Sequence, residues 1–188
     1  MRIIIATLGR VHDQKTYDSL PDKYKCKVTF VVQPHEFEEM KSLYGKRVVC
    51  LPKEVNRLPI TRQWIQETFG NERYVVIDDD AHSWHYKEPI MIEGKEVWGF
   101  KNGVSREFTV EDFDTLFKEV NEFMDNGIIH LGMLASNMKP TSEPNRYPIR
   151  SNERIMQIVF YDGPNLPKDI EWTRTLVSED IDVNLQLL

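Results

Sequence analysis

The sequence predicts an α/β fold built on a mostly parallel sheet flanked by helices. Several short apolar runs lack the polar alternation of half-exposed strands, as is typical of strands that are covered on both faces. Segments of helical composition separate many of these runs. The chain has 188 residues, 40% hydrophobic and 29% charged, which is enough to bury the core of one globular domain. We therefore expect residues 1–188 to form a single domain.

The first half of the chain alternates between strands and helices. Pro34 and Pro52 end two of the apolar runs, because proline does not continue a central strand. Gly45 and Gly70 follow segments of helical composition and are typical helix stops. We predict strands at 2–7, 26–32, 47–51 and 74–77, and helices at 36–44 and 61–69. This order indicates a Rossmann-like sheet, in which ligands bind at the carboxyl ends of the strands.

The second half adds a hairpin, a long helix and two further strands. Residues 90–100 alternate as a β-hairpin with its turn at Glu93-Gly94. Thr109 and Asp112 form a capping-box pattern at the start of a helix that stops at Asn126-Gly127. The apolar face of this helix comprises Phe113, Leu116, Phe117, Val120, Phe123 and Met124. We also predict strands at 128–134 and 155–161, a long polar loop between them and a final helix at 181–188.

Charge, cysteines and apolar segments limit the possible environments and partners. A net charge of −6 provides no general attraction to nucleic acid or to an anionic membrane. The loop 137–154 is long and locally basic, so it is either a mobile segment that follows a phosphate backbone or a merely solvated loop. We expect Cys26 and Cys50 to be buried reduced thiols. The chain starts directly with a strand and has no apolar stretch near the ~20 residues of a membrane span, so we expect a cytoplasmic protein without a membrane partner.

The acidic run Asp78-Asp79-Asp80 follows directly after the predicted buried strand at 74–77. Three adjacent carboxylates repel one another, and a hard divalent cation such as Mg²⁺ or Mn²⁺ would offset their charge. An apolar strand followed by Asp-X-Asp is typical of enzymes that present a metal ion to a diphosphate. A solvated acidic turn or a helix N-cap is the simpler alternative.

Neighbouring residues favour the metal and diphosphate interpretation. Thr7 and Arg10 leave the first strand at the same predicted sheet edge, and Arg62 can face the aspartates or a phosphate from its helix. Asp80, His82 and His85 could instead form a facial metal triad, but oxygenases of that kind consist almost entirely of strands. Trp84 would either stack on a sugar or a base of a ligand, or pack inside the protein.

Three groups of residues resemble a known family of enzymes. The segment 61–80, TRQWIQETFGNERYVVIDDD, resembles the part of GT-A glycosyltransferases in which an arginine-led helix precedes the strand bearing the DXD motif. The run SEDID at 178–182 is similar to the acidic xED element that opens a late helix of that fold. The runs TLGR at 7–10, VVQP at 31–34 and LP at 51–52 resemble motifs of the bacteriophage TET-associated glycosyltransferases, which are thought to glycosylate 5-hydroxymethylcytosine in DNA.

The resemblance implies specific roles for individual residues. Asp78 and Asp80 would hold Mn²⁺ or Mg²⁺, with Asp78 or Asp79 near the ribose of a nucleotide-sugar, most simply a UDP-sugar. Glu179 or Asp180 would be the general base on the acceptor side. The remaining assignments are Thr7, Arg10, Gln33 and Arg62 for the donor, and Trp84, Lys139, Arg146 and Arg150 for the acceptor. Many GT-A enzymes add a late histidine to the metal, whereas this sequence stops at Leu188.

We therefore predict a metal-dependent glycosyltransferase with a GT-A fold that acts on 5-hydroxymethylcytosine in phage DNA, in the cytoplasm of the host. Transfer to a protein, lipid or glycan and sugar nucleotidyl transfer are the enzymatic alternatives. A degenerate GT-A fold that only binds DNA or another partner is the alternative outside catalysis.

Overall fold

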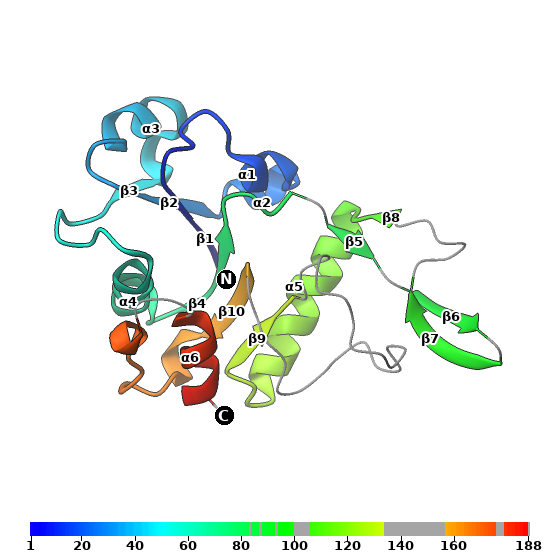
Figure 1. The fold of residues 1–188 in the computed structure, drawn as a ribbon. Coiled ribbons are helices and arrows are strands. Elements are labelled where there is room, and N and C mark those ends of the chain that lie inside the picture. The colour runs from blue at the N-terminus through cyan, green and yellow to red at the C-terminus, as the bar shows by residue number, and fades with distance from the viewer. Residues whose placement is uncertain are drawn as a thin grey trace.

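A six-stranded mixed sheet forms the centre of the molecule, with strand order β3-β2-β1-β4-β10-β9 (Figure 1). The computed structural model describes residues 1–82, 84–86, 88–92, 94–99, 106–133, 157–175 and 179–187. The strands of the sheet are β1 (Arg2–Thr7), β2 (Val28–Val32), β3 (Val48–Cys50), β4 (Arg73–Asp78), β9 (His130–Gly132) and β10 (Ile158–Asp162). Strands β1 to β4 pair in parallel, and β10 is antiparallel to both β4 and β9. The predicted α/β class and mostly parallel sheet are confirmed.

The middle of each central strand is mostly apolar, as expected for a sheet with both faces covered. Ile3, Ile4 and Ile5 of β1 are fully buried, and Ile3 and Ile5 lie opposite Val75 and Ile77 of β4. The parallel pairing brings the last residues of β1, β2 and β4 to one sheet edge. This edge carries the candidate site.

Two short helices precede β2 and change the predicted environment of one cysteine. These helices, α1 (Lys15–Ser19) and α2 (Asp22–Lys25), occupy a segment for which the sequence predicted neither a helix nor a strand. Cys26 is therefore the C-cap residue of α2 and is exposed, and Cys50 is only partly buried at the end of β3. The expected burial of both thiols is wrong, although both cysteines are free.

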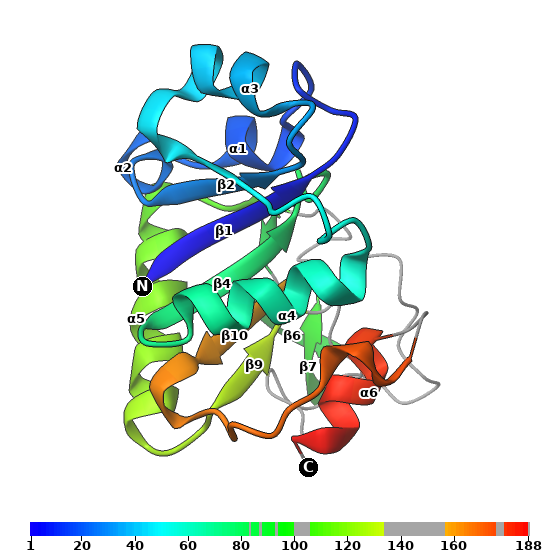
Figure 2. The same cartoon turned by 90° about the vertical axis from the view of Figure 1, so that its left-hand side faces the viewer.

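Helices cover the two faces of the sheet and form two apolar cores. The longer helices are α3 (Phe37–Tyr44), α4 (Leu58–Phe69), α5 (Val110–Asp125) and α6 (Glu179–Gln186). One core joins α1, α2, α3 and α5 to the sheet, and the other joins α4, α6 and the 3-10 helix η4 (Trp172–Arg174) to the opposite face. Figure 2 shows α4 lying across its face of the sheet. Because Pro59 suits the first turn of a helix, α4 begins three residues earlier than predicted.

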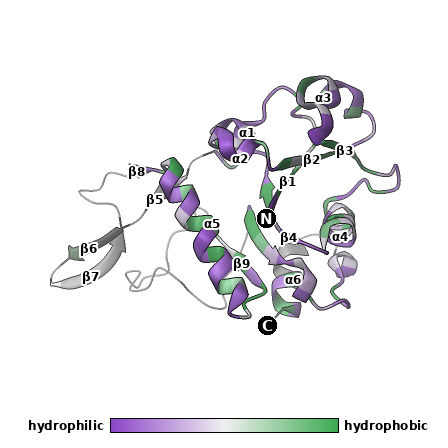
Figure 3. Ribbon diagram, turned by 180° about the vertical axis from the view of Figure 1, so that it is seen from behind, coloured by the Kyte–Doolittle hydropathy of each residue, from purple (hydrophilic) through white to green (hydrophobic). Residues whose placement is uncertain are grey.

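Helix α5 confirms the predicted capping box and apolar face. The Thr109 hydroxyl accepts the amide N–H of Asp112 at 3.3 Å, and the Asp112 carboxylate accepts the amide N–H of Thr109 at 2.7 Å. Phe113, Val120 and Met124 are buried against the sheet. Hydrophobic and hydrophilic residues alternate along α5 (Figure 3).

The predicted β-hairpin is present, and it projects away from the sheet (Figure 1). It consists of β6 (Glu88–Ile92) and β7 (Lys95–Gly99), with Gly94 at a φ of 76° in the turn. A short pair, β5 (His85–Tyr86) and β8 (Arg106–Glu107), connects it to the rest of the fold. Among the described residues, no helix is long and apolar enough to span a membrane.

Candidate functional site

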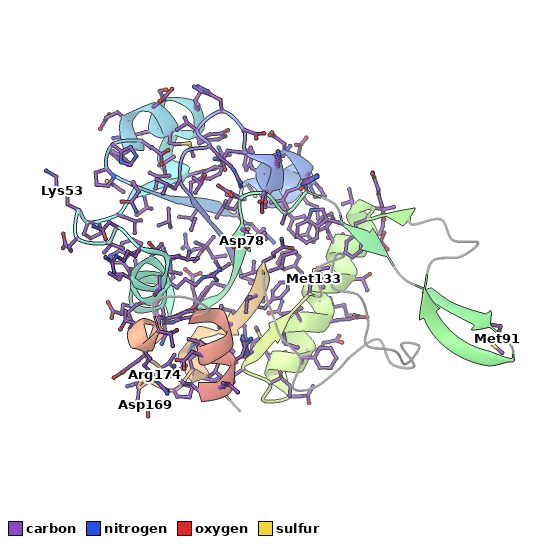
Figure 4. All side chains as sticks on the ribbon, viewed as in Figure 1. Lys53, Asp78, Met91, Met133, Asp169 and Arg174 are labelled. Carbon is purple, nitrogen blue, oxygen red and sulfur yellow. The ribbon has the colours of Figure 1, made fainter. Side chains whose placement is uncertain are left out.

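The candidate site lies where β1 and β4 end, and the predicted convergence of their side chains is present. Thr7 ends β1, Arg10 follows it, and Asp78 ends β4 near the middle of the molecule (Figure 4). Arg62 approaches the same edge from α4, and its side chain is buried. The donor-side residues that come together are therefore Thr7, Arg10, Arg62, Asp78, Asp79 and Asp80.

The middle aspartate, Asp79, is bound on both carboxylate oxygens by the protein itself. The Thr7 hydroxyl donates to Oδ2 at 2.7 Å, and the Arg10 guanidinium donates to Oδ1. The Asp79 side chain is only 14% exposed. Asp79 is therefore held by the protein and is less accessible to a ligand than Asp78 and Asp80.

The outer aspartates are more open than Asp79. Arg62 Nη2 lies 3.3 Å from Asp78 Oδ1, and Arg10 Nη1 lies 3.3 Å from Asp80 Oδ2. The side chains of Asp78 and Asp80 are 39% and 43% exposed. They are the carboxylates that a ligand can reach at this edge.

Two arginines offset part of the carboxylate repulsion that the sequence analysis assigned to a metal ion. The negative charge of Asp79, and to a lesser degree that of Asp80, raises the pKa of the Arg10 guanidinium against a smaller opposing effect of desolvation. Arg62 is a second guanidinium beside Asp78. Repulsion alone is thus no argument for a metal, and the exposure of the outer carboxylates becomes the relevant observation.

The exposed oxygens of Asp78 and Asp80 fit a magnesium or manganese ion that is shared with a substrate. These ions take oxygen ligands and are commonly held by one or two carboxylates together with phosphates and water. No group of three or more His, Cys, Asp or Glu side chains among the described residues could hold a metal by itself. A magnesium or manganese ion at Asp78 and Asp80 would need further ligands from a substrate or from water.

Helix α1 holds the backbone of the acidic run in place. The Thr16 hydroxyl donates to the carbonyl oxygen of Asp78, and the Thr16 amide donates to that of Asp79 at 3.2 Å. Gln14, just before α1, donates to the Thr7 hydroxyl at 3.0 Å. Sequence reasoning missed Gln14 and Thr16, because they lie in a short segment without helical periodicity.

The exit of β2 adds Gln33 and Glu36 to the same edge. Gln33 Nε2 donates to the Val55 carbonyl oxygen at 3.0 Å. Glu36 is buried, and its Oε1 accepts the Gly9 amide at 2.6 Å. Gly9 has a φ of 75°, a conformation that favours glycine, so this contact depends on the residue type. Gln33 was predicted to bind the nucleotide-sugar. The position of Glu36 beside Gly9 was not predicted.

The residues after the acidic run serve packing more clearly than metal binding. Trp84 is buried against Phe108 and Phe113, and its indole N–H donates to Ser19 Oγ at 3.0 Å, so the packing alternative describes it better than an acceptor platform. His82 is exposed, and its Nδ1 lies 2.7 Å from the Asp80 carbonyl oxygen. His85 lies in strand β5, whereas His82 lies in the loop that follows β4.

The predicted acceptor-side residues are only partly located. Glu179 and Asp180 are the first two residues of α6, as the acidic helix start predicted, and their side chains lie outside the described part of the chain. Lys139, Arg146 and Arg150, with the whole predicted loop 137–154, also lie outside the described residues. Their roles stay predictions.

Comparisons with known proteins identify the family. A family model described as TET-Associated Glycosyltransferase matches residues 1–188. The proteins named beta-glucosyl-HMC-alpha-glucosyl-transferase from Enterobacteria phages T6 and T2 are each 25% identical to the chain over 193 residues, covering 100% of the chain and 65% of each relative. The chain thus spans about two thirds of the length of these relatives. No solved structure matches it significantly. The chain belongs to the TET-associated glycosyltransferase family.

Proposed function

We propose that the protein transfers a sugar from a nucleotide-sugar to a hydroxyl group of DNA that contains 5-hydroxymethylcytosine. The observation that carries this proposal is the pair of half-exposed carboxylates, Asp78 and Asp80, at the carboxyl edge of parallel strands in a glycosyltransferase chain. The names of the phage T6 and T2 relatives support the acceptor class.

The donor diphosphate would lie at the outer aspartates, between the two arginines. Asp78 and Asp80 would hold Mn²⁺ or Mg²⁺, which when bound offsets the negative charge that develops on the leaving diphosphate. Arg10 and Arg62 already lie within 3.3 Å of these carboxylates and so stand close to where the phosphates would bind. Thr7 and Asp79 would support this arrangement, because Thr7 donates to Asp79 and Asp79 binds Arg10.

Gln33 supports a nucleotide-sugar whose nucleobase carries a ring N–H, such as uracil. The Val55 carbonyl oxygen can only accept a hydrogen bond, so the NH₂ group of Gln33 faces it. The side-chain carbonyl of Gln33 is then left to accept a hydrogen bond from a ligand. A UDP-sugar would donate this hydrogen bond through the N3–H of its uracil.

The acceptor hydroxyl would attack the anomeric carbon and lose its proton to a carboxylate of the xED element. Glu179 and Asp180 are the proposed general bases, because they begin α6 as the family resemblance implies. The basic residues Lys139, Arg146 and Arg150 are the proposed contacts to the DNA backbone.

A transfer assay with defined DNA tests this proposal. Duplexes that contain cytosine, 5-hydroxymethylcytosine or glucosylated 5-hydroxymethylcytosine are incubated with UDP-, GDP- and ADP-sugars, with and without Mn²⁺. We expect Mn²⁺-dependent transfer to at least one modified duplex, none to the cytosine duplex, and loss of transfer in Asp80→Ala. Thr29→Val, which changes a buried hydroxyl near the opposite ends of the strands, is the control and should retain transfer.

The other outcomes separate the alternatives. Release of pyrophosphate from a nucleoside triphosphate and a sugar 1-phosphate would indicate a sugar nucleotidyltransferase. Transfer to a protein, lipid or glycan but to no DNA would replace the acceptor while keeping the donor site. DNA binding without any metal-dependent nucleotide binding would indicate a binding module and would refute the proposed reaction.

A further inference from the structure

We infer that Gln14 is a positioning residue that commits Asp79 to the protein and thereby leaves Asp78 and Asp80 to face the ligand. The inference rests on the proposed function, because it assigns separate roles within the acidic run of the donor site. Gln14 is 1% exposed, so it acts through other residues and does not contact a substrate.

The direction of the hydrogen bonds around Gln14 follows from chemistry. Its Nε2 lies 2.6 Å from the Arg10 carbonyl oxygen, which can only accept, so the NH₂ group must lie on this side. The second hydrogen of the same group reaches Thr7 Oγ1 at 3.0 Å. Since the Thr7 hydroxyl accepts from Gln14, its own hydrogen is directed to Asp79 Oδ2, 2.7 Å away.

Gln14 therefore holds both partners of Asp79. It orients the Thr7 hydroxyl, which binds Asp79 Oδ2, and it anchors the backbone of Arg10, whose guanidinium binds Asp79 Oδ1. With both oxygens engaged, Asp79 is turned into the protein. The peptide chain then presents its neighbours, Asp78 and Asp80, on the exposed side.

Other functions for the Gln14 side chain are not supported by its surroundings. It immediately precedes α1, yet its side chain makes no hydrogen bond that caps the helix. Its Oε1 is buried and has no hydrogen-bond partner among the described residues. The described hydrogen bonds of this side-chain amide are thus made by its NH₂ group alone, as expected if its role is to donate to Thr7 and Arg10.

Two substitutions separate hydrogen bonding from packing. Gln14→Met keeps the length of the side chain and removes the donor. Gln14→Glu keeps the shape but offers only acceptors when ionised, so it would draw the Thr7 hydrogen away from Asp79 and face the Arg10 carbonyl without a donor. If the volume of the side chain alone mattered, Gln14→Met would behave like the wild type.

Calorimetry with nucleoside diphosphates and Mn²⁺ provides the test. UDP, GDP, ADP and CDP are titrated into the wild type, and the tightest ligand is then used for Gln14→Met, Gln14→Glu, Thr7→Val and the double variant Thr7→Val/Gln14→Met. We expect Gln14→Met to weaken binding by roughly tenfold, as the loss of one effective hydrogen bond implies, and Gln14→Glu to weaken it more. In the Thr7→Val background, Gln14→Met should weaken binding by a smaller factor than it does in the wild type, because only its bond to the Arg10 backbone then remains to be lost.

The controls distinguish the possible failures. Thr29→Val loses a hydroxyl of similar burial, bonded to Arg2 at 3.1 Å, and should leave the affinity unchanged even where its melting temperature falls as far as that of Thr7→Val. Wild-type affinity in both Gln14 variants, or independent effects of Gln14→Met and Thr7→Val, would overturn the positioning role. A wild type that binds none of the four nucleotides would instead refute the proposed function on which the inference rests.

Discussion

The two ends of β4 carry similar charges but differ in how far their carboxylates are exposed to solvent. At the start of the strand, Arg73 pairs with Asp162 at 3.2 Å and with Asp125 at 2.8 Å. At its end, Asp78 pairs with Arg62 at 3.3 Å. The Asp162 side chain is 2% exposed and also accepts the Asn165 amide at 2.9 Å, whereas the Asp78 side chain is 39% exposed.

This difference separates a structural cluster from a candidate ligand site. The Arg73 cluster joins β4 to β10 and to α5, and both oxygens of Asp162 are used inside the protein. The cluster at the other end leaves the outer members of the acidic run accessible at the sheet edge. An arginine beside an aspartate therefore does not by itself indicate a ligand site. The second cluster is the candidate because its exposed carboxylates lie at the carboxyl ends of parallel strands, where ligands bind in open α/β sheets.

The largest expected effect is on stability, at the start of β4. Asp162→Ala removes a buried partner of Arg73, and we expect a loss of ~3–5 kcal/mol in the free energy of unfolding, as for other broken buried ion pairs. Urea denaturation measures this loss. The transfer rate per folded molecule should stay at the wild-type value, and a selective loss of transfer would break the proposed division between the two ends.

Asp80→Asn, at the other end of the strand, should impair transfer and leave the stability nearly unchanged. Loss of a carboxylate that stabilises the leaving diphosphate should lower the transfer rate by about 10²–10³-fold. Because Asp80 is partly exposed, the free energy of unfolding should change by no more than roughly 0.5 kcal/mol. A variant that loses stability and retains transfer would assign Asp80 to the scaffold.

His130 in β9 predicts a pH dependence of stability that is independent of the site. Burial lowers the pKa of His130 from 6.5 to about 4. Below pH 6.5 the unfolded chain binds a proton at this residue, and the folded protein does so only near pH 4. Stability should therefore fall by up to ~3 kcal/mol as the pH decreases through this window.

The variant His130→Phe tests this explanation. The histidine ring stacks on Tyr161 with 5.2 Å between ring centroids, and phenylalanine can keep that contact. Urea denaturation between pH 7 and pH 4 should show a shallower decrease in stability for the variant than for the wild type. Equal slopes would place the titrating group elsewhere.

The smallest effect is expected at the start of α5. Thr109→Ala removes one half of the capping box and should cost ~1 kcal/mol of stability. Thermal denaturation measures the change. Nucleotide binding should be unaffected, and a change in affinity would show that the position of α5 influences the sheet edge.

The fold and the centre of the site were predictable from local patterns. Continuous apolar runs predicted β1 and β4, and the rule that parallel strands share a carboxyl edge predicted that Thr7, Arg10 and Asp78 would meet. The capping box at Thr109 was equally readable. In each case the signal lies in neighbouring residues.

The remaining features depend on contacts between distant segments. Gln14 and Glu36 are single polar residues whose burial follows from the way the loop after β1 folds back on itself and on the end of β2. Trp84 looked suitable for stacking on a ligand, and only the packing of Phe108 and Phe113 shows it to be a core residue. The exposure of Cys26 depended on the short helix α2, which has no periodicity to detect.

A crystal structure with Mn²⁺ and the bound nucleoside diphosphate tests the central claim most directly. We predict anomalous manganese density at coordination distance from carboxylate oxygens of Asp78 or Asp80, with the diphosphate on the same ion and Asp79 still bound to Thr7 and Arg10. Manganese and nucleotide bound at another place, with the outer aspartates facing only solvent, would contradict the account.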